Sequence, residues 1–189
     1  ATPTGASSSC GPPPTPLPPL TAGQPLTDLV RLANTSTTPN EFAATLVAQR
    51  ASKAMLPGTS TEFWTYNSML PGPLIDVFEG DTVHIRLENQ LSQETTVHWH
   101  GLPVPPSQDG NPMDPVAPGA SRLYEFTLPV GSAGTYWYHP HPHEYTAEQV
   151  FRGMAGLLIV RSRTDPVPAA IEEKLLVISD LRLAADGTI

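Results

Sequence analysis

Two short histidine-rich segments hold the side chains of this sequence that are best suited to chemistry. The stretch HWHG contains His98 and His100, and the stretch WYHPHPH contains His139, His141 and His143. Five of the six histidines in the chain therefore lie in these two places. Imidazole binds zinc, copper, iron and nickel, and copper stands highest among the divalent ions in the Irving–Williams order. Because neither segment contains a cysteine, a metal bound there would have nitrogen ligands only.

The alternate spacing of these histidines places their rings on one side of an extended chain. In a strand, residues i and i+2 point to the same face and lie about 6.5 to 7 Å apart. His98 and His100 would therefore share a face, with Trp99 on the opposite one. This spacing fits one metal held by both rings, and it also fits two metals side by side. The prolines of WYHPHPH fix φ at about −65° and remove amide donors, which stiffens the segment and lowers the entropy lost when a metal binds.

We predict that four of the histidines bind metal. They are the members of the two HxH pairs: His98, His100, His139 and His141. His143 continues the spacing, but it lies between a proline and a glutamate at the expected end of the strand, and we predict that it is not a ligand. His84 stands alone on a predicted strand, so we expect a surface or hydrogen-bonded residue.

Short strands separated by turn residues are expected to position these histidines. The stretch PGPLIDVFEGDTVHIRLENQL is typical of two strands around the turn 79–81, and in the second strand apolar and polar residues alternate. Further strands are predicted near residues 42–50, 95–102, 121–129, 134–141 and 153–161. The apolar run 155–160 is typical of a strand buried on both faces. Since no long helix is predicted, the pattern indicates an all-β, Greek-key β-sandwich.

The composition suggests three parts of the chain. Residues 1–26 hold eight of the 23 prolines and are predicted to form an extended arm. Residues 27–163 would form the sandwich. In residues 164–189, the linker TDPVPAA precedes EEKLLVISDLRLAADGTI, in which we expect another strand and a turn. A strand without partners cannot bury its faces, so this one should either dock on the first domain or begin a second.

The bulk properties exclude some classes of protein. A net charge of −8 and a pI of about 5.1 argue against nucleic-acid binding, which depends on clustered Lys and Arg. No apolar run reaches the length of about 20 residues that spans a bilayer. The start lacks the features of a signal peptide and is compatible with a processed N-terminus at Ala1. Cys10 is the single cysteine and is expected to be a solvated thiol.

From residue 64 to residue 160 the chain resembles the first cupredoxin domain of the multicopper oxidases, of the laccase, ascorbate oxidase and periplasmic cuprous oxidase type. The motifs that carry the resemblance are PGPLIDVFEGDTV, HWHGL, DGNPMDPVAPG, GTYWYHPHPH and FRGMAGLLIV. The resemblance implies a cupredoxin-like fold, copper as the cofactor and a periplasmic or secreted location. It implies that type 1 copper takes electrons from a reducing substrate, a phenol or a metal ion, and that a trinuclear copper cluster reduces O2 to water.

The resemblance also implies roles for individual residues. By position, His98 matches the type 2 copper ligand, whereas the other three match type 3 ligands: His100, His139 and His141. The two rings of each pair would then reach neighbouring coppers. Asp109 lies where the family often has a carboxylate near the type 2 copper, and it could relay protons; the alternative is a simple Asp-Gly turn residue. The aromatic residues Trp99, Trp137 and Tyr138 are expected to pack as walls of the site.

Part of the family pattern is missing from these 189 residues. The other trinuclear ligands and the type 1 cysteine come from the third domain of the family, and Cys10 cannot replace that cysteine. Glu144 stands where relatives often have glycine. We therefore expect the chain to require the remaining oxidase domains, as a separate stretch or chain, and not to reduce O2 alone. The alternatives are a copper module for storage or transfer, or a copper-free relative, against which the intact HWH and HPH pairs argue. The reducing substrate and the oligomeric state stay open.

Overall fold

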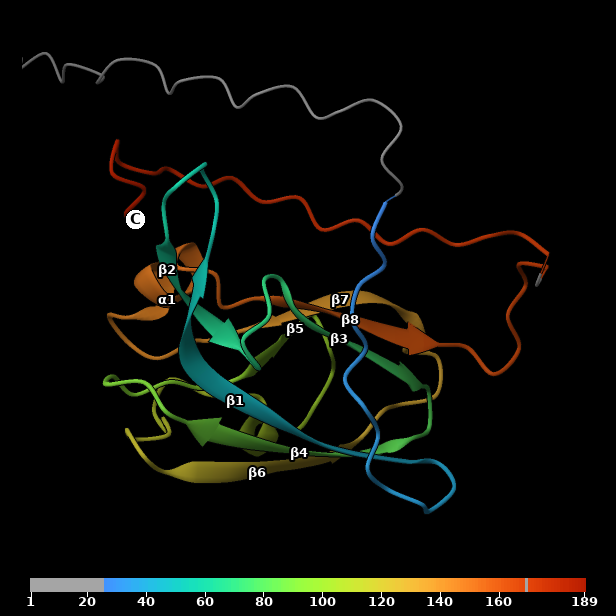
Figure 1. The fold of residues 1–189 in the computed structure, drawn as a ribbon. Helices are drawn as coiled ribbons and strands as arrows, with labels where there is room; N and C mark the ends of the chain where they lie inside the picture. Colours follow the sequence, from blue (N-terminus) through green and yellow to red (C-terminus); the bar gives the residue numbers. More distant parts are fainter. Residues whose placement is uncertain (1–25, 169) are drawn as a thin grey trace, which may run out of the picture.

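Two four-stranded sheets enclose the hydrophobic core of the protein (Figure 1). This computed structural model describes residues 26–168 and 170–189. Cys10 and all but the last residue of the predicted arm lie outside the described residues. The first sheet has the order β2 (Thr61–Tyr66), β1 (Glu41–Lys53), β4 (Thr82–Asn89) and β6 (Ser121–Thr127). The second has the order β3 (Gly72–Phe78), β8 (Gly156–Arg161), β7 (Gly134–His139) and β5 (His98–His100). The predicted all-β sandwich is confirmed.

Buried and more exposed side chains alternate along β4, which is an inner strand of the first sheet. Val83, Ile85 and Leu87 are buried, whereas the residues between them are half-buried or exposed. The strand pairs in parallel with β1 and antiparallel with β6. Its buried face packs toward the second sheet because burial of apolar side chains is the main favourable term in folding. The alternation predicted from the sequence is confirmed.

The turn between β3 and β4 carries the chain from one sheet to the other. Gly80 has φ +83°, a conformation that glycine adopts without a steric cost. The side chain of Asp81 accepts a hydrogen bond from the Phe78 amide at 2.9 Å and pairs with Arg163 at 2.5 Å. The two strands predicted around this turn are therefore both present, but they lie in different sheets and do not pair with each other.

The structure differs from the sequence-based expectation after the second histidine segment. A short helix, α1 (Thr146–Phe151), follows the second histidine segment and was not predicted. Within the described part of residues 164–189 no strand forms, although a strand was predicted there. The physical reason is that the segment runs across the outside of the sandwich without a neighbouring strand to take its backbone hydrogen bonds (Figure 1).

The segment that was expected to form this strand is instead held at its two ends. The guanidinium group of Arg161 pairs with the Glu173 carboxylate at 2.7 Å. Near the other end, the Thr61 hydroxyl donates a hydrogen bond to the Gly187 carbonyl oxygen at 2.7 Å. Between these contacts the chain exposes apolar side chains: Leu176, Val177 and Ile178. The assignment of residues 164–189 to a linker and the start of a second domain stays a prediction.

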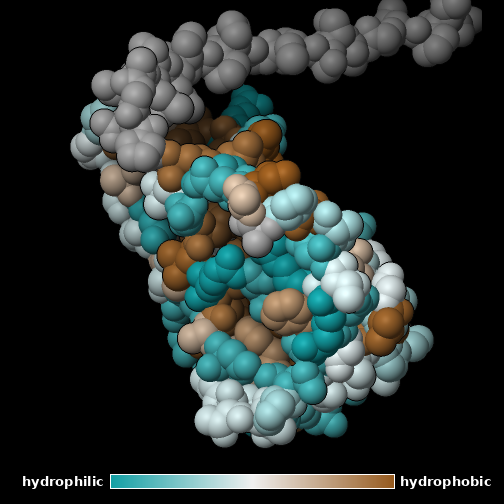
Figure 2. Space-filling model, turned by 90° about the vertical axis from the view of Figure 1, so that its right-hand side faces the viewer, coloured by the Kyte–Doolittle hydropathy of each residue, from teal (hydrophilic) through white to brown (hydrophobic). Residues whose placement is uncertain are grey.

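Hydrophobic and hydrophilic patches alternate on the surface that Figure 2 shows, which is the right-hand side of the molecule in Figure 1. Residues 163–168 lie on this side (Figure 1) and include Val167, of which 52% is exposed. Across residues 26–168 and 170–189, we find no helix whose length and apolar character would allow it to cross a membrane.

Candidate metal centre

The pairing of β5 with β7 brings the two histidine segments together. His98 lies opposite His139, Trp99 opposite Tyr138, and His100 opposite Trp137. Trp99 and Tyr138 are fully buried and point into the core. Because alternate residues of a strand point to opposite faces, the histidines of these strands are turned away from the core and toward one another.

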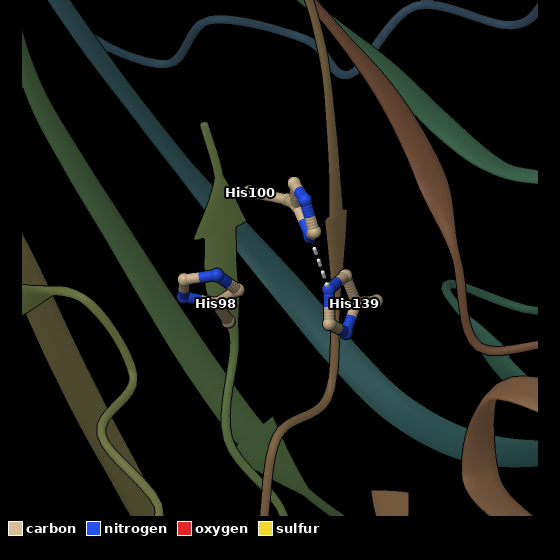
Figure 3. Close-up of side chains that lie close together, drawn as sticks. All are labelled: His98, His100 and His139. Carbon is tan, nitrogen blue, oxygen red and sulfur yellow. Dashed lines mark hydrogen bonds between the residues drawn. The ribbon is translucent and has the colours of Figure 1, made fainter. Parts of the chain in front are cut away.

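Three of the predicted ligands form a tight group. Ring nitrogens of His98, His100 and His139 all lie within 4.8 Å of one another (Figure 3). Nδ1 of His100 lies 3.1 Å from Nε2 of His139, which is a hydrogen bond between the two rings. Figure 3 shows that His98 and His100 come from one strand and His139 from the other, with all three rings directed at a shared space. Two of the sequence-predicted residues on β5 and one on β7 are thus brought together.

His141 lies beside this group. Its ring centroid is 5.3 Å from that of His98 and 6.1 Å from that of His139. Pro140 has no amide hydrogen, so β7 ends at His139 and His141 lies beyond the paired strand. The Nδ1 atom of His141 is buried and has no hydrogen-bond partner among the residues that the structure describes. A buried polar atom without a partner is rare in proteins, and a bound metal would satisfy it.

The hydrogen bonds of the rings determine which nitrogen atoms carry the lone pairs. Nδ1 of His139 lies 2.8 Å from the carbonyl oxygen of Pro140, and Nδ1 of His98 lies 2.9 Å from that of Asp109. A carbonyl oxygen only accepts hydrogen bonds, so each Nδ1 carries the hydrogen and each Nε2 has the lone pair. In His139 that lone pair accepts the hydrogen bond from Nδ1 of His100, and a metal could take the place of this bond. Ligating histidines in proteins are usually oriented by such a bond from their other nitrogen. The residues present therefore fit a metal site with nitrogen ligands.

Burial also favours the neutral form of His139. Its pKa is lowered from 6.5 to about 4, mainly because burial penalises the charged imidazolium; the neighbouring imidazoles of His98, His100 and His141 add to the effect, whereas the hydrogen bond to Pro140 opposes it. A histidine must be deprotonated to bind a metal. His139 is therefore ready to act as a ligand at neutral pH.

The lowered pKa of His139 predicts how the stability of the metal-free chain depends on pH. Between 6.5 and about 4, the unfolded chain binds a proton at this residue that the folded chain does not bind. The free energy of unfolding should therefore be highest above pH 6.5 and should decrease as the pH falls toward 4. Urea unfolding at about pH 7.5 and about pH 5 should show a larger loss for the wild type than for His139→Gln, in which residue 139 does not titrate. Equal losses in the two proteins would contradict this assignment.

One aromatic side chain, that of Trp137, packs against the histidine rings. The ring of Trp137 lies 4.9 Å from His100 and 4.1 Å from His139, centroid to centroid, with an interplanar angle of 30° in each case. Trp137 is 38% exposed, so it covers the rings from the solvent side. Trp99 donates its indole hydrogen to the Gln108 carbonyl at 2.9 Å, and the Tyr138 hydroxyl donates to Pro73 at 2.6 Å. Trp137 therefore packs as a wall of the site, as expected, whereas Trp99 and Tyr138 point into the core on the opposite face of their strands, where they do not line the site.

Asp109 lies beside His98, as the sequence predicted. It directly follows the short 3-10 helix η1 (Pro106–Gln108). Nδ1 of His98 is 2.9 Å from the carbonyl oxygen of Asp109 and 3.1 Å from its carboxylate Oδ1. The single hydrogen on Nδ1 goes to the nearer carbonyl, which leaves the buried Oδ1 without a hydrogen-bond partner among the described residues. Asp109, His98 and His141 all line a hollow of about 150 Å³.

His84 and His143 lie outside the group, as predicted. Nε2 of His84 is 2.8 Å from Glu41 and Nδ1 is 2.9 Å from Glu125, so this residue is hydrogen-bonded at the surface of the first sheet. His143 is exposed, just before α1.

The residue after His143 has an unusual backbone conformation. Glu144 has φ +66°, which costs an L-residue about 1 to 2 kcal/mol relative to the right-handed region. A glycine, which relatives in the family often have at this place, would avoid that cost. The side chain of Glu144 is exposed.

Glu144→Gly is therefore expected to stabilise the chain, by about 0.5 to 1 kcal/mol after the greater freedom of glycine in the unfolded chain is subtracted. Urea unfolding would measure the change. Glu144→Ala is the matched control, because alanine removes the same side chain but keeps the strained conformation, and it should give no gain. A gain of the same size with alanine would show that the side chain, and not the backbone, is responsible.

Three further residues hold the histidine segments in place. Gly110 packs against the backbone of Val97 and His98. The Thr96 hydroxyl accepts a hydrogen bond from the His141 amide at 2.8 Å. The third residue, Gln149, is a fully buried amide on α1. Only Gly110 had a signal in the sequence, since it follows Asp109 in a dipeptide typical of turns.

Known proteins resemble this chain over most of its described part. A family model described as multicopper oxidase matches residues 48–165. The multicopper oxidase mco of Staphylococcus aureus is 40% identical over 116 residues, which is 61% of this chain and 26% of that protein. A solved multicopper oxidase from Campylobacter jejuni, a metallo-oxidase, has a TM-score of 0.73 and 48% identity over 74% of this chain and 30% of its own. A laccase from Pediococcus acidilactici has a TM-score of 0.69 and 39% identity, also over 74% of this chain.

The matched region is short compared with these relatives. The chain spans 26% of the Staphylococcus protein and 30% of each of the two solved chains. Both HxH pairs and the strands that carry them lie inside the region that the family model matches, residues 48–165.

Proposed function

Since this chain belongs to the multicopper oxidase family, we propose that it supplies half of the ligands of a trinuclear copper cluster in an oxidase. The proposed oxidase couples one-electron oxidation of a reducing substrate, a phenol or a metal ion, to the four-electron reduction of O2 to water. The cupredoxin-like β-sandwich expected for such a domain is confirmed. The observation that carries the proposal is the group of ring nitrogens of His98, His100 and His139 within 4.8 Å of one another.

The proposed division of ligands follows the positions of the family motifs. His98 would bind the type 2 copper, and the type 3 coppers would be bound by the other three: His100, His139 and His141. Copper, when bound, would supply the redox steps that transfer electrons to O2. The open side of the group supports this proposal, because His100 is exposed and a second set of ligands could approach it from there. Those ligands, and the type 1 copper site, would come from other domains of the same oxidase.

The chain's own residues would orient the ligands, exclude water and move protons. The carbonyl groups of Pro140 and Asp109 hold the Nδ1 hydrogens of His139 and His98, which directs both Nε2 atoms to the shared space. Trp137 covers two of the rings from solvent. The Oδ1 atom of Asp109 is free of hydrogen bonds from the described residues, and Asp109 is one of the residues that line the hollow beside His98. A carboxylate in this place can pass protons to the site, and reduction of O2 to water consumes protons.

We also propose where this oxidase is located and what the 189-residue chain cannot do alone. A periplasmic or secreted location is proposed from the type of oxidase that the sequence resembles. The 189-residue chain alone is proposed to bind copper but not to reduce O2, because the cluster requires ligands from two domains.

Two measurements on the 189-residue chain test the proposal. A native mass spectrum after addition of Cu(II) and removal of the excess should show bound copper. An oxygen electrode should then show no O2 consumption by this copper-loaded chain with a phenolic substrate. A chain that retains no copper would overturn the proposed site, and O2 consumption in proportion to bound copper would overturn the proposed need for other domains. The variant His98→Ala, His139→Ala is the control for copper bound elsewhere on the surface.

A further inference from the structure

A fully buried glutamine connects the short helix α1 to the segment before the first histidine pair. Oε1 of Gln149 accepts a hydrogen bond from the Thr95 hydroxyl at 2.8 Å. Its Nε2 donates to the Glu94 carbonyl at 2.8 Å and to the Gln93 side chain at 3.3 Å. No part of Gln149 is exposed, and its amide oxygen and nitrogen both have partners in the segment 93–95. A buried amide that is satisfied in this way holds its partners in one arrangement, because breaking any bond leaves an unpaired polar group.

The same segment contacts the second histidine pair. The Thr96 hydroxyl accepts a hydrogen bond from the His141 amide at 2.8 Å. Thr96 is fully buried, and His98 follows it by two residues. Thr95 is held in turn by two backbone hydrogen bonds with Val116, of 2.7 and 3.1 Å. A segment of two threonines therefore lies between the two pairs of ligands and is fixed from both sides.

The helix closes this set of contacts into a ring. α1 begins at Thr146, five positions after His141, and the Thr146 hydroxyl donates to the Pro142 carbonyl at 2.6 Å. The chain thus runs from His141 through α1 to Gln149, and the side chain of Gln149 returns to the residues beside Thr96. His141 needs such support, because it lies beyond the end of β7 and no strand pairing holds it.

We propose that Gln149 and Thr96 are positioning residues, which set the distance between the histidine pairs by holding the backbone of His141 against the segment that leads to His98. The two imidazole rings whose spacing they would control have centroids 5.3 Å apart. Neither residue is proposed to touch a metal. The expected effect on metal binding rests on the proposed copper site. The contacts that hold His141 do not depend on it, because they can be tested in the metal-free chain.

Amide hydrogen exchange of the metal-free 189-residue chain is the first test. In Thr96→Val, which removes the acceptor but keeps the shape, the His141 amide should exchange about tenfold faster relative to the Ile85 amide. Ile85 in β4 is fully buried and reports global unfolding. Gln149→Met should have the same effect through loss of the bonds to segment 93–95, and Thr96→Ser should restore the exchange rate of the wild type. Thr65→Val is the matched control, because Thr65 is also fully buried and its hydroxyl donates to a backbone carbonyl, but it lies on β2.

Copper affinity is the second test, with Cu(II) alone as the probe. Thr96→Val and Gln149→Met should each weaken Cu(II) binding about tenfold, which is typical when a residue that supports a ligand is lost. Thr96→Ser and Thr65→Val should bind as the wild type does. In a His141→Ala background the loss caused by Thr96→Val should vanish, because the residue through which it acts is gone.

The outcomes separate this inference from the proposed function. If the His141 amide keeps its relative protection in Thr96→Val, or if the loss of affinity persists in the His141→Ala background, the positioning role is wrong. If the wild type binds no Cu(II), the proposed copper site fails, and hydrogen exchange alone then decides whether Thr96 and Gln149 hold His141.

Discussion

His98→Ala is expected to lower the affinity of the chain for Cu(II) by a factor on the order of 100 or more, since loss of a ligand should exceed the 10- to 100-fold effects seen for residues that only support ligands. His98 lies at the centre of the group: its ring centroid is 5.6 Å from that of His100 and 5.3 Å from those of His139 and His141. Its removal would therefore take away the one ring that lies close to all three others, while His100 and His139 would stay in contact.

Titration calorimetry of the metal-free chain with Cu(II), in the presence of a competing chelator, would measure this loss. His143→Ala is the matched control, because His143 belongs to the same histidine-rich segment but is exposed and lies outside the group. The control should bind Cu(II) as the wild type does. If His98→Ala and His143→Ala had equal affinities, the copper would be bound somewhere else on the chain.

Gly110→Ala is expected to have the largest effect on stability. Gly110 is buried at φ +65°, and a Cβ atom there would lie 2.8 Å from the His98 amide nitrogen and closer still to the Val97 carbonyl. The clash is with backbone, which cannot rotate away. We expect a loss of about 3 kcal/mol, from about 1 kcal/mol for an L-residue in this conformation and about 2 kcal/mol for overpacking. Displacement of the His98 backbone should weaken copper binding as well.

Gly119→Ala separates the two contributions to this loss. Gly119 has φ +75°, but nothing lies within 4 Å of the place where its Cβ would be. The variant should therefore lose only about 1 kcal/mol, with no change in Cu(II) affinity. Urea unfolding and the Cu(II) titration described for His98 would measure both. If Gly110→Ala lost no more free energy of unfolding than Gly119→Ala, the backbone at His98 would be able to shift and make room for the methyl group without a loss of stability.

Much of the fold and of the site could be predicted because it depends on short-range patterns. Alternation in β4 predicts which of its side chains are buried, and the spacing of HWH predicts that Trp99 faces the core while His98 and His100 face away. These features follow from the pleat of a single strand. The proline after His139 likewise explains why the paired part of β7 ends there.

The features that could not be predicted depend on partners distant in the sequence. Gln149 bonds to Gln93, Glu94 and Thr95, more than 50 positions away, and no local pattern indicates such a contact. The segment after residue 171 has the composition of a strand, but it forms none, because no strand among the described residues lies beside it to pair with it.

The pairing of β5 with β7 also determines when in the life of the molecule a metal can be bound. His100 and His139 are 39 positions apart. Bringing them together requires closure of a long loop, and the chain loses conformational entropy in that step before the new contacts stabilise it. The ligand group therefore does not exist in an unfolded chain or in an intermediate that lacks β5. The sandwich has a hydrophobic core of its own, so it should not need a metal in order to fold, as small zinc domains do. Copper would instead enter a finished sandwich, from the side where His100 is exposed, and loading would be a maturation step that follows folding.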